Sequence, residues 1–225
     1  MNVAIVLAGG VGSRMGSNIP KQFIECGGVP VLARTLRAFS ACDEIDGIVV
    51  VTLAEGLEET RRIIAEFGIE KVKSVVIGGK TRRESSFNGV LEAKRLGADI
   101  VLIHDAARPN VTKRIIRDNI AAAAEFGACE TAIEVTDTVI RVYDGKMGDV
   151  VPRENLYRVQ TPQSFKTDII IKCHEKAANL PESERAKVTD DAMMVKNAGI
   201  DVVIVRGDYN NIKITTSGDL DLIKT

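Results

Sequence analysis

The sequence has few of the residues that build metal sites, disulfide frameworks and membrane spans. Its four cysteines lie far apart, none of them in a CxxC pair, and there are only two histidines, so we expect reduced thiols and no zinc site. The apolar runs are only strand-length, and no basic segment precedes the first one, which argues against a membrane span or a signal peptide. With 30 basic and 31 acidic residues, the chain has no general field for nucleic acid or anionic lipid. We therefore expect a cytoplasmic protein that binds anions only locally.

Short apolar runs alternate along the chain with longer amphipathic segments. The 225 residues, 45% of them hydrophobic, can bury a sizeable core, and this length favours one domain over residues 1–225. The expected strands cover residues 3–7, 47–52, 72–77, 100–104, 131–135 and 202–205. The expected helices cover residues 30–41, 57–67, 83–96 and 113–126. This alternation predicts an α/β fold with a Rossmann-like, doubly wound and mostly parallel sheet, whose ligands bind beyond the carboxyl ends of the strands.

One segment departs from this alternation. Residues 134–151 read as a strand, a turn at Asp144 and Gly145, and a second strand, which predicts a β-hairpin that projects from the body. A lone hairpin has no core of its own and is marginally stable in water. We therefore expect this arm, at about residues 134–153, to pack on a second copy of the chain in a homodimer.

A glycine-rich loop follows the first expected strand. The segment from Leu7 to Gly16 holds four glycines that can turn backbone N–H groups toward an anion. Arg14 lies within this loop and Lys21 follows it, after a proline that stiffens the approach. Two cations beside a phosphate-binding loop suit a nucleoside triphosphate.

Two other glycine-loop classes fit the sequence less well. A dinucleotide site requires G-x-G-x-x-G and an acidic residue near the end of the second strand. Here Met15 takes the third glycine's place, and the second strand ends in Val51 and Thr52. A Walker A loop requires a Gly-Lys-Ser/Thr sequence, which does not follow the loop. A merely tight turn remains an alternative that the loop alone does not exclude.

Seven blocks of sequence together resemble a known family. They are LAGGVGSRMGSNIPKQF at 7–23, GGKTRRESSFNG at 78–89, HDAARP at 104–109, TDT at 136–138, QTPQSF at 160–165, TDDA at 189–192 and NIKITT at 211–216. The chain thus resembles the cytidylyltransferases that act on 2-C-methyl-D-erythritol 4-phosphate, and their sister enzymes that act on D-ribitol 5-phosphate. Because the blocks keep the family's order over nearly the whole chain, the resemblance implies a nucleotidyltransferase-type fold, CTP as a substrate, and Mg²⁺ or another divalent cation.

The resemblance also implies roles for charged residues. Arg14 and Lys21 would contact the triphosphate and the transition state, and Lys213 would support the α-phosphate from a late strand. Asp105 would lie near the metal ion and the sugar hydroxyls, and Arg108 would help to hold the acceptor. Without the family resemblance, Asp105 and Arg108 are also consistent with a surface ion pair around a turn. Lys213 is then also consistent with a solvated lysine.

The acceptor phosphate and the base have their own expected contacts. By resemblance, Arg153 would reach from the arm into the neighbouring subunit's site and grip the acceptor's phosphate, as a bidentate guanidinium can. The expected hydroxyl contacts to the acceptor are Thr138, Thr161 and Thr189. The expected nucleotide contacts are Ala8, Gly9, Gly10, Gly12, Gly79 and Ser85. Lys80 and Arg34 depart from the family's usual residues, and the sequence gives no role to either.

The chemistry needs little proton removal. A phosphomonoester has its second pKa near ~6 and is largely dianionic at neutral pH, so fixed cations and Mg²⁺ matter more than a base. The blocks favour methylerythritol phosphate narrowly, with ribitol 5-phosphate as the alternative acceptor. A nucleotide-binding module without catalytic activity is an alternative of another class, which the full set of charged residues disfavours.

Overall fold

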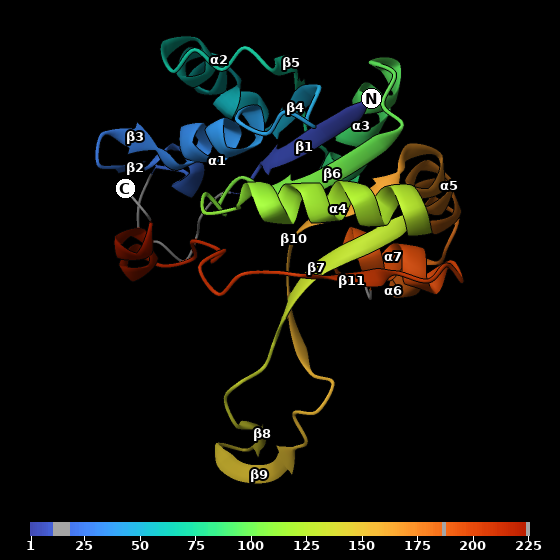
Figure 1. Cartoon of the computed structure of the whole chain (residues 1–225). Coiled ribbons are helices and arrows are strands. Elements are labelled where there is room, and N and C mark those ends of the chain that lie inside the picture. Colours follow the sequence, from blue (N-terminus) through green and yellow to red (C-terminus); the bar gives the residue numbers. More distant parts are fainter. Residues whose placement is uncertain (11–18, 186–187, 224–225) are drawn as a thin grey trace.

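The computed structural model describes residues 1–10, 19–185 and 188–223. A seven-stranded sheet runs through it in the order β11-β7-β10-β6-β1-β4-β5 (Figure 1). All pairings in this sheet are parallel except those of β10, which is antiparallel to both β6 and β7. The strands are β1 (Asn2–Ala8), β4 (Gly47–Thr52), β5 (Val72–Ile77), β6 (Ile100–Asp105), β7 (Ala128–Glu134), β10 (Tyr157–Lys166) and β11 (Val203–Arg206). The predicted doubly wound, mostly parallel sheet is confirmed.

Helices cover both faces of this sheet. One face carries α1 (Val31–Ser40), α2 (Leu57–Glu66) and α4 (Lys113–Phe126), and the other carries α3 (Arg82–Arg95), α5 (Thr167–Ala178) and α7 (Asp191–Asn197). The short elements are β2 (Glu25–Cys26), β3 (Val29–Pro30), α6 (Glu182–Arg185) and 3₁₀ turns at Lys21–Phe23, Ala54–Gly56 and Ser217–Leu222. Among the helices that the structure describes, none is both long and apolar enough to cross a membrane.

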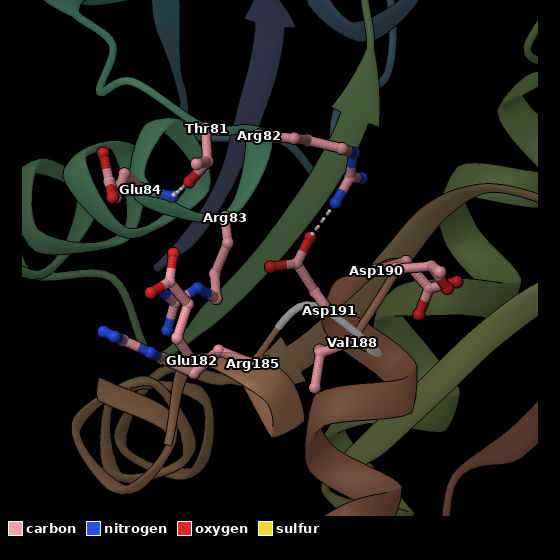
Figure 2. A pocket seen from close by; sticks show the side chains of 10 residues that line it. Thr81, Arg82, Arg83, Glu84, Glu182, Arg185, Val188, Asp190 and Asp191 are labelled. Atoms are coloured by element: carbon pink, nitrogen blue, oxygen red, sulfur yellow. Dashed lines mark hydrogen bonds and ion pairs between the residues drawn. The ribbon is translucent and has the colours of Figure 1, made fainter. Parts of the chain in front are cut away.

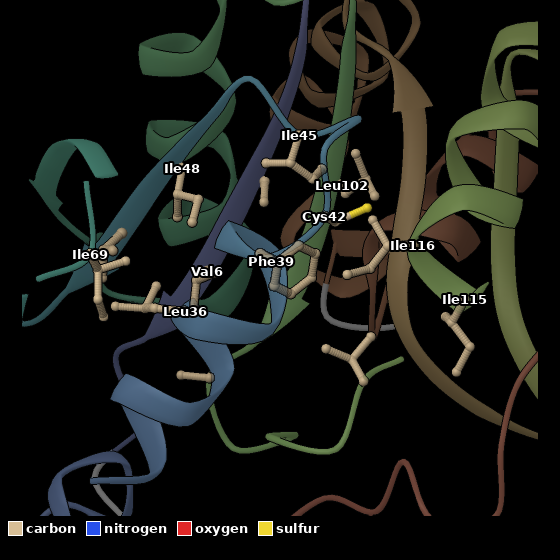
Figure 3. Packing of buried hydrophobic residues seen from close by; sticks show 14 of the residues in the cluster. Val6, Leu36, Phe39, Cys42, Ile45, Ile48, Ile69, Leu102, Ile115 and Ile116 are labelled. Carbon is tan, nitrogen blue, oxygen red and sulfur yellow. The ribbon is translucent and has the colours of Figure 1, made fainter. Parts of the chain in front are cut away.

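The central strands are apolar on both faces because each face is covered by helices. In β1, Ala4 and Val6 face the α1 side, whereas Val3 and Ile5 face the α3 side, and all four are fully buried. Figure 3 shows the buried hydrophobic cluster on the α1 side of the sheet, in which Phe39 of α1 packs among aliphatic side chains. Burying one such aliphatic side chain contributes about 1.5 to 3 kcal/mol, so the buried centre of the sheet stabilises the scaffold that positions the strand ends.

Helix α3 approaches the sheet closely. A Cβ at Gly89 would lie 2.4 Å from Ile5 Cγ2 and 2.8 Å from Val51 Cγ2, so a larger residue would push the helix outward. Thr81 caps the N-terminus of this helix, and its hydroxyl accepts a hydrogen bond from Glu84 N at 3.1 Å. This cap satisfies one of the N–H groups that have no partner within the helix. The start of α3 is therefore fixed at the carboxyl edge of the sheet.

The predicted hairpin is present and projects from the body (Figure 1). Strands β8 (Val139–Tyr143) and β9 (Lys146–Val151) form a separate two-stranded sheet. The turn between them has positive φ at Asp144 (51°) and Gly145 (75°), as two-residue hairpins of type I′ require. The Asp-Gly pair in the sequence therefore marked this turn correctly.

Two features differ from the sequence-based expectations. Residues 157–166 were not predicted as a strand, yet they form β10 at the centre of the sheet. Lys213 was expected on a late strand, which is wrong because residues 211–215 form no strand. This segment is held instead by single contacts, such as Ile214 N donating to Ala107 O at 2.9 Å.

Candidate active site

A cavity of about 400 Å³ opens at the carboxyl edge of the parallel strands, where the fold class places its ligands. Segments that follow β1, β4, β5 and β6 meet there, together with residues 21–22 and Lys213. Its lining residues are Leu7, Gly9, Gly10, Lys21, Gln22, Leu53, Gly79, Lys80, Thr81, Arg82, Ser85, Asp105, Ala106, Ala107 and Lys213. We call this space the nucleotide cavity. It brings together seven of the residues predicted from the sequence: Gly9, Gly10, Lys21, Gly79, Ser85, Asp105 and Lys213.

Two lysines from opposite ends of the chain meet at this cavity. Lys21 Nζ donates a hydrogen bond to the backbone oxygen of Ile214 at 3.0 Å, so its ammonium lies beside the segment that carries Lys213. A Cβ built on Gly10 would lie 3.6 Å from Lys21 Cε, which places the same lysine against Gly10 of the glycine-rich loop. The geometry therefore concentrates positive charge at one wall of the nucleotide cavity.

Asp105 is the carboxylate of this site. It ends β6, and its Oδ2 is 2.6 Å from Lys213 Nζ while its Oδ1 is 3.8 Å from Arg82 Nε. Burial alone would raise the pKa of Asp105, but the charges of Lys213 and Arg82 outweigh burial and hold this pKa well below its usual range. Asp105 is therefore an anion whose charge is shared by two cations.

The opposite wall is the start of α3. Ser85 Oγ accepts a hydrogen bond from Gly79 N at 3.1 Å and donates one to Thr81 O at 2.9 Å. A Cβ at Gly79 would lie 2.3 Å from Glu84 Cβ, so only glycine fits where the chain passes the helix end. Lys80 N donates to Glu84 Oε2 at 2.7 Å. This wall is consequently a rigid turn whose backbone and small hydroxyl face the cavity.

Other predicted residues support the site from behind. Ala8 is buried, and its carbonyl accepts a hydrogen bond from Gln22 Nε2 at 2.7 Å. Arg108 does not line the cavity; its Nη1 donates to Asn211 O at 2.7 Å and so ties the end of β6 to the segment before Lys213. Thr161 is also buried, and its hydroxyl accepts from Asp105 N at 3.2 Å. In this single chain these three residues shape the cavity from outside it.

His104 packs in the interior. Its ring lies 4.9 Å from the ring of Phe39 and makes hydrogen-bond contacts with Thr161 Oγ1 at 3.0 Å and Arg108 O at 3.1 Å. Burial lowers the pKa of His104 to about 4. The imidazole is therefore neutral at physiological pH and braces the carboxyl end of β6.

A second cavity, of about 410 Å³, adjoins the first. Thr189 is one of its lining residues. Figure 2 shows other residues of this lining, at the starts of α3 and α7. Arg82 and Thr81 line both cavities. Arg82 Nη1 is 2.7 Å from Asp191 Oδ2, an ion pair drawn as a dashed line in Figure 2. We call this second space the adjoining cavity; Asp191 lines it, whereas Asp105 lines the nucleotide cavity.

Some predicted residues are not gathered at either cavity. Thr138 and Arg153 are exposed on the arm, where Arg153 Nη1 donates to Thr136 O at 2.5 Å. Gly12 and Arg14 lie outside the described residues. The hairpin extends away from the body (Figure 1), and neither Thr138 nor Arg153 lines the two cavities of its own chain.

Sequence reasoning missed Arg82 and Asp191 as individual site residues. Both lie in blocks that were noticed, 78–89 and 189–192, but neither has a spacing that singles it out. Arg34, which the sequence left without a role, donates from Nη2 to Cys26 O at 2.5 Å and so fixes the β2–β3 turn. For Arg82 and Asp191, the missing signal is a contact between segments distant in the chain.

Comparisons with known proteins agree on the family. The model of the family described as "IspD: 2-C-methyl-D-erythritol 4-phosphate cytidylyltransferase" matches residues 2–225. The protein of that name from Clostridium botulinum strain Langeland is 44% identical over 222 residues, 98% of this chain and 95% of the relative. The relative from Clostridium novyi is 42% identical over 98% of this chain and 94% of its own length.

Solved structures give the same answer. A 4-diphosphocytidyl-2C-methyl-D-erythritol synthase from Anaerococcus prevotii superimposes with a TM-score of 0.82 at 32% identity, over 98% of this chain and 93% of that one. A 2-C-methyl-D-erythritol 4-phosphate cytidylyltransferase from Thermus thermophilus gives a TM-score of 0.78 at 30% identity, over 99% and 96%. The resemblance read from the sequence blocks is thereby confirmed, and the chain belongs to the 2-C-methyl-D-erythritol 4-phosphate cytidylyltransferase family.

Proposed function

We propose that this nucleotidyltransferase transfers CMP from CTP to 2-C-methyl-D-erythritol 4-phosphate and releases pyrophosphate. The observation that carries the proposal is the meeting of Lys21, Lys213 and Asp105 at one cavity, beside the first loop and the start of α3. The family and the relatives reported above favour methylerythritol phosphate over ribitol 5-phosphate, which the sequence blocks alone left open.

The reaction is an in-line displacement at the α-phosphorus of CTP. An oxygen of the acceptor's phosphate forms a bond to that phosphorus, and the bond to the oxygen bridging the α- and β-phosphorus atoms breaks, so that pyrophosphate leaves with the bonding electron pair. The acceptor phosphate is already ionised, so no side chain has to remove a proton. The barrier lies in joining two polyanions, and it falls when fixed positive charges face the phosphoryl oxygens.

The charged residues of the cavity supply that stabilisation. We assign Lys21 and Lys213 to the α-phosphate and the transition state, with Arg14 of the first loop as a third cation. Lys213 has three N–H donors, so it can keep its contact with Asp105 and still donate to a phosphate oxygen. Gly9, Gly10 and Gly12 would offer backbone N–H groups to the triphosphate, and Gly79 and Ser85 would contact the cytosine, with Ala8 beside them.

Asp105 is the residue that would hold a divalent cation. In the described part of the chain, no three His, Cys, Asp or Glu side chains gather into a metal site. Mg²⁺ commonly binds through one or two carboxylates while substrate phosphates and water complete its coordination, so a lone ionised carboxylate beside a triphosphate site fits this ion. When bound, Mg²⁺ neutralises phosphate charge and orients the triphosphate.

The acceptor would lie between the nucleotide cavity and the adjoining cavity, near Thr189, with Arg108 and Thr161 holding the wall behind it. We propose that Arg153 and Thr138 reach this acceptor from the arm of a second copy in a homodimer. Exposed apolar side chains support this role for the arm, since Val142, Tyr143, Met147 and Val150 are each more than half exposed. Packing against a partner would cover them. We further propose that residues 1–225 act as one domain and that the dimer works in the cytoplasm.

Pyrophosphate release with purified protein tests the proposal. CTP, UTP, ATP and GTP are each supplied with methylerythritol phosphate, and CTP is also supplied with ribitol 5-phosphate. We expect kcat/KM to be highest for CTP with methylerythritol phosphate, by about two decades or more over ribitol 5-phosphate, because a buried group left without its partner costs that order of discrimination. Equal rates with both acceptors would refute the assignment of the acceptor. CTP binding without turnover on either would favour the binding-module alternative.

A further inference from the structure

Arg82 separates the nucleotide cavity from the adjoining cavity and faces a carboxylate on each side. Its Nη1 donates a 2.7 Å hydrogen bond to Asp191 Oδ2, whereas its Nε is 3.8 Å from Asp105 Oδ1. Figure 2 shows the side chain extending from the start of α3 toward Asp191 at the start of α7. The guanidinium is thus hydrogen-bonded to Asp191 and held at ion-pair distance from the carboxylate of the active site.

Asp191 is unusual because it is an aspartate in the protein interior, with a side chain that is only 1% exposed. Ser86 Oγ donates to its Oδ1 at 2.7 Å, His174 Nε2 lies 3.5 Å from the same oxygen, and its backbone N donates to Gln163 Oε1 at 3.2 Å. Burial would raise the pKa of Asp191, but the nearby His174 and the charge of Arg82 more than offset burial and lower it. The chain therefore keeps an ionised carboxylate in its interior.

A buried charge is costly unless its partners compensate for it, and a whole buried ion pair can often be replaced by neutral side chains of similar size without loss of stability. The partners of Asp191 differ in what they need from it. Ser86 and His174 can donate to a neutral amide oxygen as well as to a carboxylate, whereas the hydrogen bond from the Arg82 guanidinium is strongest when its acceptor is also charged. The need for a charge at this position therefore points to Arg82.

We propose that Asp191 is a positioning residue for the transfer reaction: it fixes Arg82, and Arg82 then orients Asp105 beside Lys213. The inference rests on the function proposed above, since it assigns Asp191 to the same site. An arginine side chain has many rotamers, and the hydrogen bond to Asp191 selects one that faces Asp105. With Arg82 sharing the charge of Asp105, Lys213 keeps N–H donors for a phosphate oxygen.

A role in packing alone makes a different prediction. Asp191 also joins α3, α5 and α7 through Ser86 and His174, so its loss will lower stability whether or not it acts on the site. A purely structural effect on turnover would be the same with or without Arg82. An effect that passes through Arg82 disappears once Arg82 is replaced. The two readings are separated by a double-mutant cycle.

The cycle uses Asp191→Asn, Arg82→Gln and the double variant, with pyrophosphate release and calorimetric CTP binding as readouts. We expect Asp191→Asn to lower kcat about tenfold when Arg82 is present and less than about twofold in the Arg82→Gln background, a coupling typical of contacting charges. The matched control is Asp168→Asn, which removes a carboxylate of α5 that pairs with Lys94 of α3 at 2.7 Å, outside the lining of both cavities. Its kcat should stay within about twofold of wild type.

A second variant covers the case in which Asp191→Asn does not fold. Arg82→Lys keeps the charge, but a single ammonium cannot face both carboxylates as a planar guanidinium does. It should lose about tenfold in kcat, as Asp191→Asn does, without a matching loss in melting temperature. Full activity of Arg82→Lys would overturn the proposal, and so would equal effects of Asp191→Asn in the two backgrounds.

The outcomes also separate this inference from the proposed function. If wild type releases pyrophosphate and the cycle is additive, only the role of Asp191 fails. If wild type shows no turnover, the proposed function fails, and CTP binding then decides the inference. In that case Asp191→Asn should weaken CTP binding at least about threefold, a coupling within the range for groups in contact, and only while Arg82 is present. Unchanged CTP binding would overturn the inference.

Discussion

Replacing Lys213 with methionine removes one ammonium from the nucleotide cavity and keeps most of the aliphatic stem. If Lys213 stabilises charge that builds up at the α-phosphate, the loss should resemble that of one fixed donor, about 3 to 4 kcal/mol of transition-state stabilisation. That corresponds to a fall of about two to three decades in kcat. Binding of CTP should weaken much less, because the charge at the α-phosphorus is greatest in the transition state.

The same substitution has a stability cost that the structure sets. Asp105 would lose the 2.6 Å contact and keep the more distant Arg82 at 3.8 Å. Leaving a fully buried charge without its partner costs about 3 to 5 kcal/mol. Since the Lys213 side chain is 39% exposed and Asp105 is 13% exposed, we expect a smaller loss of about 1 to 2 kcal/mol after solvent screening. In a domain of this size that lowers the melting temperature by about 2 to 8 °C.

The assay is steady-state pyrophosphate release at saturating CTP and acceptor, with thermal unfolding measured on the same samples. Lys196→Met is the matched control, because Lys196 also pairs with a carboxylate, Asp201, at 2.7 Å on an exposed surface. It should leave kcat unchanged. A kcat for Lys213→Met within about threefold of wild type, in a folded protein, would refute the electrostatic role of Lys213.

Two further predictions test the neighbouring groups. Lys21→Ala should lower kcat by roughly two to three decades, since it removes another cation from the same wall; an unchanged kcat at saturating CTP counts against its role. Glu130→Gln tests a pH effect: burial and the nearby Asp190 raise the pKa of Glu130 from 4.5 to about 7, so wild type gains stability as pH falls below that value and loses it as pH rises through about 7. At pH 8 the free energy of unfolding of the variant should exceed that of wild type by about 1 to 2 kcal/mol, after discounting for partial exposure. At pH 4 the two free energies of unfolding should be equal. A gain that is equal at both pH values contradicts the assignment.

The sequence predicted the elements whose pattern is local. Residues 113–126 have apolar residues at helical spacing throughout and follow a threonine, and α4 has those bounds. Thr112 caps the helix, because its Oγ1 accepts a hydrogen bond from Ile115 N at 3.3 Å. The Asp144-Gly145 pair located the arm's turn for a similar reason, because only a few residue types adopt positive φ at low cost. These features depend on residues a few positions apart.

Strand β10 was missed because most of its buried positions are polar. Gln160, Thr161, Gln163 and Ser164 are all buried, so the strand lacks the apolar run that marked its neighbours. Their side chains are satisfied by partners far along the chain; Ser164 Oγ, for example, donates to Asn119 Oδ1 at 2.9 Å. Such a strand can be identified only once its hydrogen-bond partners are known.

The candidate site was predictable in part. Lys21, Asp105 and Lys213 were proposed from sequence blocks, and the fold places all three at one cavity. The link from Arg82 to Asp191 could not be predicted, because it joins two residues 109 positions apart. It depends on α3 and α7 lying on the same face of the sheet, a packing result that no local pattern contains.

The most direct test of the account is a crystal structure of the protein with CTP and Mg²⁺ bound. The account predicts that the triphosphate occupies the nucleotide cavity, with α-phosphate oxygens within salt-bridge distance, about 4 Å, of Nζ of both Lys21 and Lys213. A triphosphate bound in another cavity, or an α-phosphate beyond that distance from both lysines, would contradict it.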